Sequence, residues 1–111
     1  MSGTDIFKLA VRRMADSAMA VIQAAKLTPS QVECVIPHQA NIRIIQAMAK
    51  MAGIPMEKIF VNVDRYGNTS AASNLIALYE AAEEGRIQRG DRVVLVAFGA
   101  GLTWGSIALQ W

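Results

Sequence analysis

Two polar side chains in this sequence stand where α/β proteins usually place groups that contact a ligand. His38 closely follows an apolar segment, residues 32–36, that is typical of a buried strand, and Asn68 follows a second such segment, residues 59–63. If the two strands are neighbours in a parallel sheet, both side chains emerge at its carboxyl edge, where open α/β sheets bind their ligands. The spacing therefore predicts a ligand-contacting site that pairs an imidazole with a carboxamide.

Each candidate side chain also has a structural explanation. A lone histidine in an α/β domain is more often structural or exposed than catalytic, and Asn68 beside Gly67 can be a turn residue with left-handed backbone geometry. The single cysteine, Cys34, lies inside the first predicted strand without a helix N-terminus to activate its thiol, so we expect a plain buried residue. One His and one Cys without further clustered ligands predict no metal site.

The elements that would hold this site alternate between helices and strands. Apolar residues at helical spacing, with capping and stop residues at the ends, predict three long helices, and near-continuous apolar segments predict four strands. The helices span residues 6–26, 41–52 and 70–84, with a capped turn at 28–31, and the strands span residues 32–36, 59–63, 93–98 and 102–111. The third helix is expected to face inward with Leu75, Ile76 and Tyr79. The order α-β-α-β-α-β-β predicts a layered α/β fold that ends in an antiparallel hairpin.

Composition and charge narrow the class of protein. The 111 residues are 53% hydrophobic and 18% charged, which excludes a disordered chain and fits one domain or less. A net charge of +2, with a pI near 9.0, is too small to propose nucleic-acid binding but suits a local cationic patch for an acidic partner. No apolar segment is long enough for a membrane span, and no signal-peptide pattern is present. With one cysteine and no internal disulfide, the cytoplasm is the expected compartment.

Four ordered segments of the chain resemble one family, the β-ketoacyl-acyl carrier protein (ACP) synthase III enzymes of the thiolase superfamily. The segments are MSGTDIFK at 1–8, IPHQAN at 36–41, DRYGNTSAAS at 64–73 and FGAGLTWG at 98–105. The resemblance spans residues 1–111 but only the C-terminal portion of that enzyme, whose fold has two similar halves with a five-stranded mixed sheet in each. It implies a thiolase-like half domain, layered α-β-α, without the first strand of the half.

The resemblance implies a decarboxylative condensation that begins type II fatty-acid synthesis. In the family, an active-site cysteine takes an acyl group from acyl-CoA, usually acetyl-CoA, and malonyl-ACP then loses carbon dioxide and attacks the acyl-enzyme. By this resemblance His38 and Asn68 donate to the malonyl thioester oxygen, and the backbone N–H of Ala100 serves the oxyanion hole of the acyl-cysteine. The nucleophile belongs to the absent N-terminal half and Cys34 does not match it, so the chain alone is expected to be inactive. No cofactor is implied, because acyl-CoA and malonyl-ACP are substrates.

Further positions match the substrate and carrier surfaces of the family. Asn41, Gly3 and Phe7 match residues that line the pantetheine tunnel, and Asn41 can serve as a helix N-cap at the same time. A basic patch that receives the acidic acyl carrier protein is matched by Lys8, Arg43 and Lys50. Exposed cations are often simply solvated, but their charge complements such a partner. The resemblance also implies a homodimer once the N-terminal half is present.

Two other functions stay open for these residues. One is another thiolase-superfamily condensing enzyme, such as a polyketide or signal-molecule synthase, and the other is a non-catalytic module that binds a carrier protein. The absent first strand is expected to lie between the strands at 32–36 and 93–98, where its loss would leave a slot with unpaired backbone groups. The chain is therefore predicted to be part of a longer polypeptide or to be completed by a partner chain.

Overall fold

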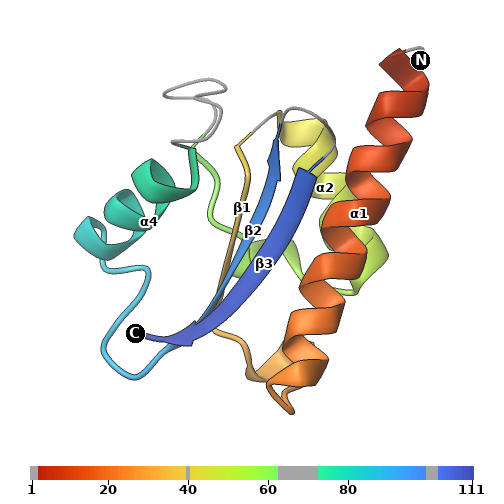
Figure 1. Cartoon of the computed structure of the whole chain (residues 1–111). Coiled ribbons are helices and arrows are strands. Elements are labelled where there is room, and N and C mark those ends of the chain that lie inside the picture. The colour runs from red at the N-terminus through yellow and green to blue at the C-terminus, as the bar shows by residue number, and fades with distance from the viewer. Residues whose placement is uncertain (1–2, 40, 63–72, 100–102) are drawn as a thin grey trace.

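In the part of the chain that the structure describes, three strands form a mixed sheet with helices on both faces (Figure 1). The computed structural model describes residues 3–39, 41–62, 73–99 and 103–111. The helices are α1 (Gly3–Ala24), α2 (Ile42–Ala52) and α4 (Ser73–Glu83), and short 3-10 turns lie at Pro29–Gln31 and Met56–Lys58. The strands are β1 (Cys34–Pro37), β2 (Arg92–Gly99) and β3 (Thr103–Gln110).

Strand β2 lies at the centre of the described sheet. It pairs in parallel with β1, from Cys34↔Val93 to Pro37↔Val96, and antiparallel with β3 along the whole of both strands. The prediction of an open slot between the strands at 32–36 and 93–98 is therefore wrong, because the backbone groups of β1 and β2 are hydrogen-bonded to one another. The antiparallel hairpin at the end of the chain is confirmed, although its turn at residues 100–102 lies outside the described residues.

Alternation along the strands divides the core into two layers. Val35, Val94 and Val96 pack in the layer with α1 and α2. Cys34 and Ile36 pack in the layer with α4. Successive side chains of a strand point to opposite faces, so apolar residues at every position fit strands that are covered on both sides. Figure 1 shows this arrangement, with α1 and α2 on one face of the sheet and α4 on the other.

Local signals set the ends of α2 and of the first 3-10 turn. Asn41 has extended backbone, and its side-chain oxygen accepts a hydrogen bond from the Ile44 N–H at 2.9 Å. Gly53 ends the helix at φ +71°, a left-handed conformation that glycine adopts without steric cost. The helix predicted over 41–52 is confirmed to within one residue, and the capped turn predicted at 28–31 is confirmed with its capping box.

The strand predicted over residues 59–63 is wrong for the residues that can be checked. Residues 59–62 make one isolated parallel bridge, Ile59 to Val35, and continue without strand geometry. The Phe60 N–H donates to the carbonyl of Val35 at 2.9 Å, so this segment does run beside β1 in the parallel direction. The prediction that the segments at 32–36 and 59–63 lie side by side in parallel is thus confirmed at this bridge.

The inner face of α4 also differs from the expectation. Tyr79, predicted to face inward, is 67% exposed, and Ile76 is half-buried. Ala77 and Ala81, one helical turn apart, are fully buried against the sheet layer of Ile36. The side chain of Leu75 lies outside the described ones. Among the described residues, no helix combines the length and apolar character that crossing a membrane requires.

Candidate active site

His38 lies directly after β1, at the carboxyl edge of the sheet, as predicted. Its backbone N–H donates to the carbonyl of Val96 at 2.6 Å and so extends the β1–β2 ladder by one residue. The residue is only 8% exposed, and this burial lowers the pKa of the imidazole below its ordinary value of 6.5, because the charged form loses hydration. At neutral pH the ring is therefore uncharged and keeps one N–H to donate.

Several of the predicted site positions converge on this edge. Figure 1 shows the first turns of α1 and α2 and the arrowhead of β2 at the same end of the molecule. Gly3 begins α1, and Asn41 caps α2 three residues after His38. On neighbouring faces of the two helices, the guanidinium carbon of Arg43 lies 6.0 Å from the ring centroid of Phe7, within the range of a cation–π contact. The predicted tunnel and docking positions are therefore adjacent.

The three predicted docking cations are all exposed. Lys8 and Arg43 lie near the first turns of α1 and α2, close to the carboxyl edge. Lys50 lies in the last turn of α2, roughly 10 Å farther along the helix axis. The structure thus brings two of these cations to the edge and places the third at the far end of the same helix.

Two predicted site residues, Asn68 and Ala100, lie outside the described residues. The pairing of His38 with Asn68 and the backbone donor at Ala100 therefore stay predictions. The described chain does approach the edge from the expected side: residues 59–62 run parallel to β1, and the chain continues from Asn62 to Asn68.

Gln39 is a buried residue to which the sequence analysis assigned no role. It is 1% exposed, and its Nε2 donates to the carbonyls of Pro37 at 2.9 Å and Phe60 at 3.1 Å. Its Oε1 accepts a hydrogen bond from the N–H of Asn62 at 2.8 Å. The side chain therefore ties the loop that carries His38 to the segment that leads toward Asn68. One signal pointed to it, namely a long polar side chain two residues after a buried strand.

Cys34 is buried, as predicted, and is fully inaccessible. Burial raises the pKa of its thiol above the ordinary value of 9.0, and the nearby Arg86 opposes this only in part. The thiol is therefore protonated at neutral pH, and its side chain is not exposed at the surface. Its surroundings fit a structural residue in the layer beneath α4.

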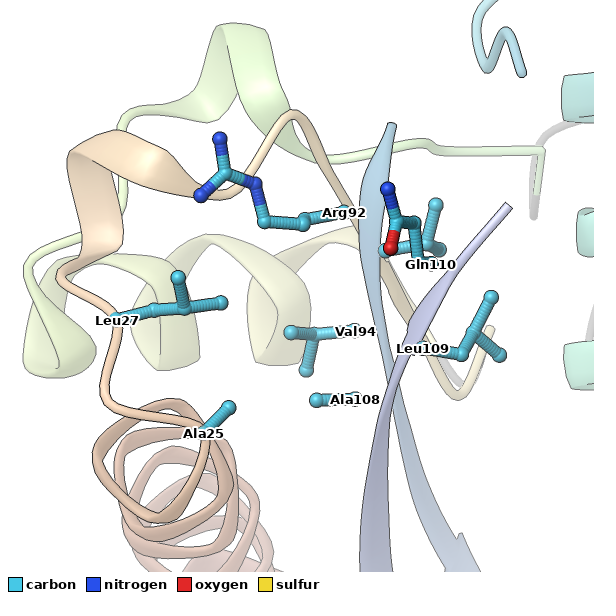
Figure 2. A pocket seen from close by; sticks show the side chains of 8 residues that line it. Ala25, Leu27, Arg92, Val94, Ala108, Leu109 and Gln110 are labelled. Carbon is cyan, nitrogen blue, oxygen red and sulfur yellow. The ribbon is translucent and has the colours of Figure 1, made fainter. Parts of the chain in front are cut away.

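A cavity of about 230 Å³ lies at the opposite, amino edge of the sheet (Figure 2). It forms between the end of α1, the start of β2 and the end of β3. Apolar side chains such as Leu27, Val94 and Ala108 line it together with the polar Arg92 and Gln110. None of the predicted site residues that the structure describes lines this cavity, and His38 lies at the other edge.

Comparison with known proteins identifies the family. The family described as 3-oxoacyl-[acyl-carrier-protein (ACP)] synthase III C terminal matches residues 22–111. The chain belongs to this family. Its synthase III relatives include the β-ketoacyl-[acyl-carrier-protein] synthase III of Roseiflexus sp. (strain RS-1), 55% identical over 111 residues, and that of Clostridioides difficile (strain 630), 51% identical over 111 residues. Each alignment covers 100% of this chain and 34% of the relative.

A solved synthase III structure has the same fold over the whole chain. The crystal structure of 3-oxoacyl-[acyl-carrier-protein] synthase III from Aquifex aeolicus VF5 matches with a TM-score of 0.96 at 51% identity, covering 100% of this chain and 36% of that one. The predicted fold class, a thiolase-like half domain with a mixed sheet, is confirmed. The chain spans about a third of the length of its synthase III relatives.

Proposed function

We propose that the complete protein is a β-ketoacyl-ACP synthase III, an acyltransferase that condenses an acyl-CoA, such as acetyl-CoA, with malonyl-ACP at the start of fatty-acid synthesis. One observation carries this proposal: a synthase III fold holds His38 buried and uncharged at the carboxyl edge of its sheet. A neutral N–H donor at that place can stabilise negative charge that develops on a bound oxygen.

The chemistry assigns a task to each side chain of the site. When malonyl-ACP loses carbon dioxide, the electron pair of the broken C–C bond is shared between the α-carbon and the thioester oxygen. His38 and Asn68 each donate one hydrogen bond to that oxygen, which lowers the energy of the enolate. The carbanion then attacks the carbonyl carbon of an acyl group on the cysteine of the N-terminal half, and the backbone N–H of Ala100 stabilises the oxyanion of the tetrahedral intermediate. As this intermediate collapses, the C–S bond breaks and the cysteine leaves as a thiolate. These steps use no cofactor.

The carrier and its pantetheine arm are proposed to approach along the first turns of α1 and α2. Gly3, Phe7 and Asn41 would line the tunnel for the arm. The exposed Arg43 stands beside Phe7, so a phosphate or carrier carboxylate at Arg43 would lie next to the tunnel mouth. The remaining docking cations are Lys8 and Lys50, whose charge would steer an acidic carrier protein toward this surface.

The test separates the two half-reactions of the complete enzyme. His38→Ala and Asn68→Ala should each slow malonyl-ACP decarboxylation by about 100- to 1000-fold, as expected for the loss of one oxyanion donor. Acylation of the cysteine by radiolabelled acyl-CoA should stay close to the wild-type rate, because both donors serve the malonyl thioester. Normal decarboxylation by both variants would contradict the assignment.

A further inference from the structure

The carboxamide of Gln39 has an orientation that its neighbours determine. The backbone N–H of Asn62 can only donate, so the atom that faces it must be Oε1. The carbonyls of Pro37 and Phe60 can only accept, so the atom that faces them must be Nε2. With both Nε2 hydrogens and one Oε1 lone pair engaged inside the protein, the side chain is held in one place.

This carboxamide takes the position of a peptide group in a β-ladder. Among the described residues, backbone pairing between β1 and the segment at 59–62 consists of the bridge of Val35 with Ile59 and the hydrogen bond from Phe60 to Val35. On its other side β1 pairs with β2 along its whole length, and the bond from His38 to Val96 continues that pairing. A carboxamide carries the same donor and acceptor as a peptide unit, so Gln39 satisfies the Phe60 carbonyl and the Asn62 N–H instead.

The consequence is a link between the two segments of the chain that lead to the proposed donors, His38 and Asn68. Gln39 is covalently next to His38, whose backbone is fixed on β2. Through Asn62 it fixes the point from which the chain continues to Asn68. The link joins Gln39 to Phe60 and Asn62, which are 21 and 23 positions away in the sequence. All three residues are buried. Water therefore offers no easy replacement for the hydrogen bonds of this link.

We infer that Gln39 is a positioning residue for malonyl decarboxylation, setting the separation of His38 from the segment that carries Asn68. This inference rests on the proposed function above. The described hydrogen bonds of the Gln39 side chain go to main-chain atoms, so its proposed action is through the placement of other groups. Two oxyanion donors must converge on one oxygen, and an error of about 1 Å in such a geometry can cost roughly 100-fold in rate.

The first test compares Gln39→Met with a matched control in the complete enzyme. Methionine keeps the length of the side chain but removes the three described hydrogen bonds to main-chain atoms, so malonyl-ACP decarboxylation should fall by about 10- to 100-fold. Cysteine acylation by acyl-CoA should stay near the wild-type rate. The control, Gln88→Met, changes an exposed glutamine in the loop before β2 and should alter neither half-reaction. Equal loss in both half-reactions, or loss in neither, would overturn the inference.

A second variant makes the positioning role visible as a pH dependence. In Gln39→Glu the protonated carboxyl group can donate one hydrogen bond and accept another, whereas the carboxylate can only accept. The ratio of variant to wild-type decarboxylation rate should therefore fall as the pH rises through the pKa of the new carboxyl. A ratio independent of pH would overturn the inference. Gln39→Glu at low pH also carries the test if Gln39→Met fails to fold.

Amide hydrogen exchange distinguishes a failure of this inference from a failure of the proposed function. In Gln39→Met the Asn62 amide loses its acceptor and should exchange faster, while the Phe60 amide keeps its bond to Val35. Unchanged exchange at Asn62 would overturn the role of Gln39 as a link whatever the enzyme does. A wild-type protein that does not decarboxylate malonyl-ACP would instead overturn the proposed function.

Discussion

The two edges of the described sheet differ in how they hold polar side chains. At the carboxyl edge, His38, Gln39 and Asn62 are buried. At the amino edge, Arg92 Nη2 lies 3.7 Å from Glu33 Oε1, and the two side chains are 43% and 39% exposed. The amino edge also contains the cavity of Figure 2, and Leu109, which borders it, is half-buried, whereas Ile36 near the carboxyl edge is fully buried.

This difference indicates that polar groups lower the stability of the protein more at the carboxyl edge than at the amino edge. The Nδ2 of Asn62 is buried without a hydrogen-bond partner among the described residues. Such a group costs about 1–3 kcal/mol, whereas an exposed ion pair exchanges with water at little cost. Buried polar groups gather next to His38, the edge at which the proposed chemistry takes place. The predictions that follow test this contrast between the edges.

The largest expected effect comes from a packing change at each edge. Ile36→Ala should lower the free energy of unfolding by about 2–5 kcal/mol, because it opens a cavity in a fully buried layer. Leu109→Ala at the amino edge should cost clearly less, since Leu109 is half-buried and already borders the cavity. Urea unfolding of the complete protein measures both. Equal losses would show that the two edges are packed alike.

A smaller effect is expected from pH, acting through His38. The folded protein holds the pKa of this imidazole below the ordinary 6.5, so the unfolded chain binds more protons in mild acid. The contribution of the uncharged His38 ring to the free energy of unfolding is fully present above pH 6.5. It is lost as the pH falls through 6.5 toward the folded pKa, by at most about 1.4 kcal/mol per pH unit. In urea titrations from about pH 5 to 7, His38→Gln should show a shallower pH dependence than wild type. Identical slopes would contradict the buried, uncharged imidazole.

The smallest effect is expected at the amino edge, for Glu33→Gln. This change removes the charge that faces Arg92 but keeps a side-chain oxygen that can accept from the Arg92 backbone N–H. Exposed ion pairs contribute about 0–1 kcal/mol, so thermal unfolding of the complete protein should shift only slightly. Raising the salt concentration should reduce the shift further. A loss as large as that of Ile36→Ala would remove the contrast between the edges.

Features set by neighbours in the sequence could be predicted, and features set by distant contacts could not. The ends of α2 depend on Asn41 and Gly53, whose signals act within four residues, so the sequence contains them directly. The place of His38 follows from a polar residue after an apolar strand. The segment at 59–62 has the apolar character of a strand, but the backbone of Asn62 bonds to the side chain of Gln39, 23 residues away. No local pattern encodes that bond.

The orientation of α4 shows a second limit of the same kind. Its sequence has large apolar side chains on one side and alanines on another, and periodicity alone does not say which side faces the sheet. The structure buries Ala77 and Ala81 and exposes Tyr79. Likewise, the lowered pKa of His38 comes from burial by the whole fold. The sequence shows that a histidine stands at this position, but only tertiary packing determines the charge state of its ring.

The parallel pairing of β1 with β2 has a consequence for the folding rate. Glu33 and Arg92, bonded through their backbones at the start of this pairing, are 59 residues apart in the sequence. Closing a loop of that length costs about 3.6 kcal/mol of chain entropy in its length-dependent part, before any contact compensates for it. The hairpin of β2 and β3 and the turns of α1 need no such closure and are expected to form earlier. Because His38 is anchored to Val96 across this pairing, a newly made chain should acquire its helices and hairpin well before its histidine reaches the position that the proposed chemistry requires.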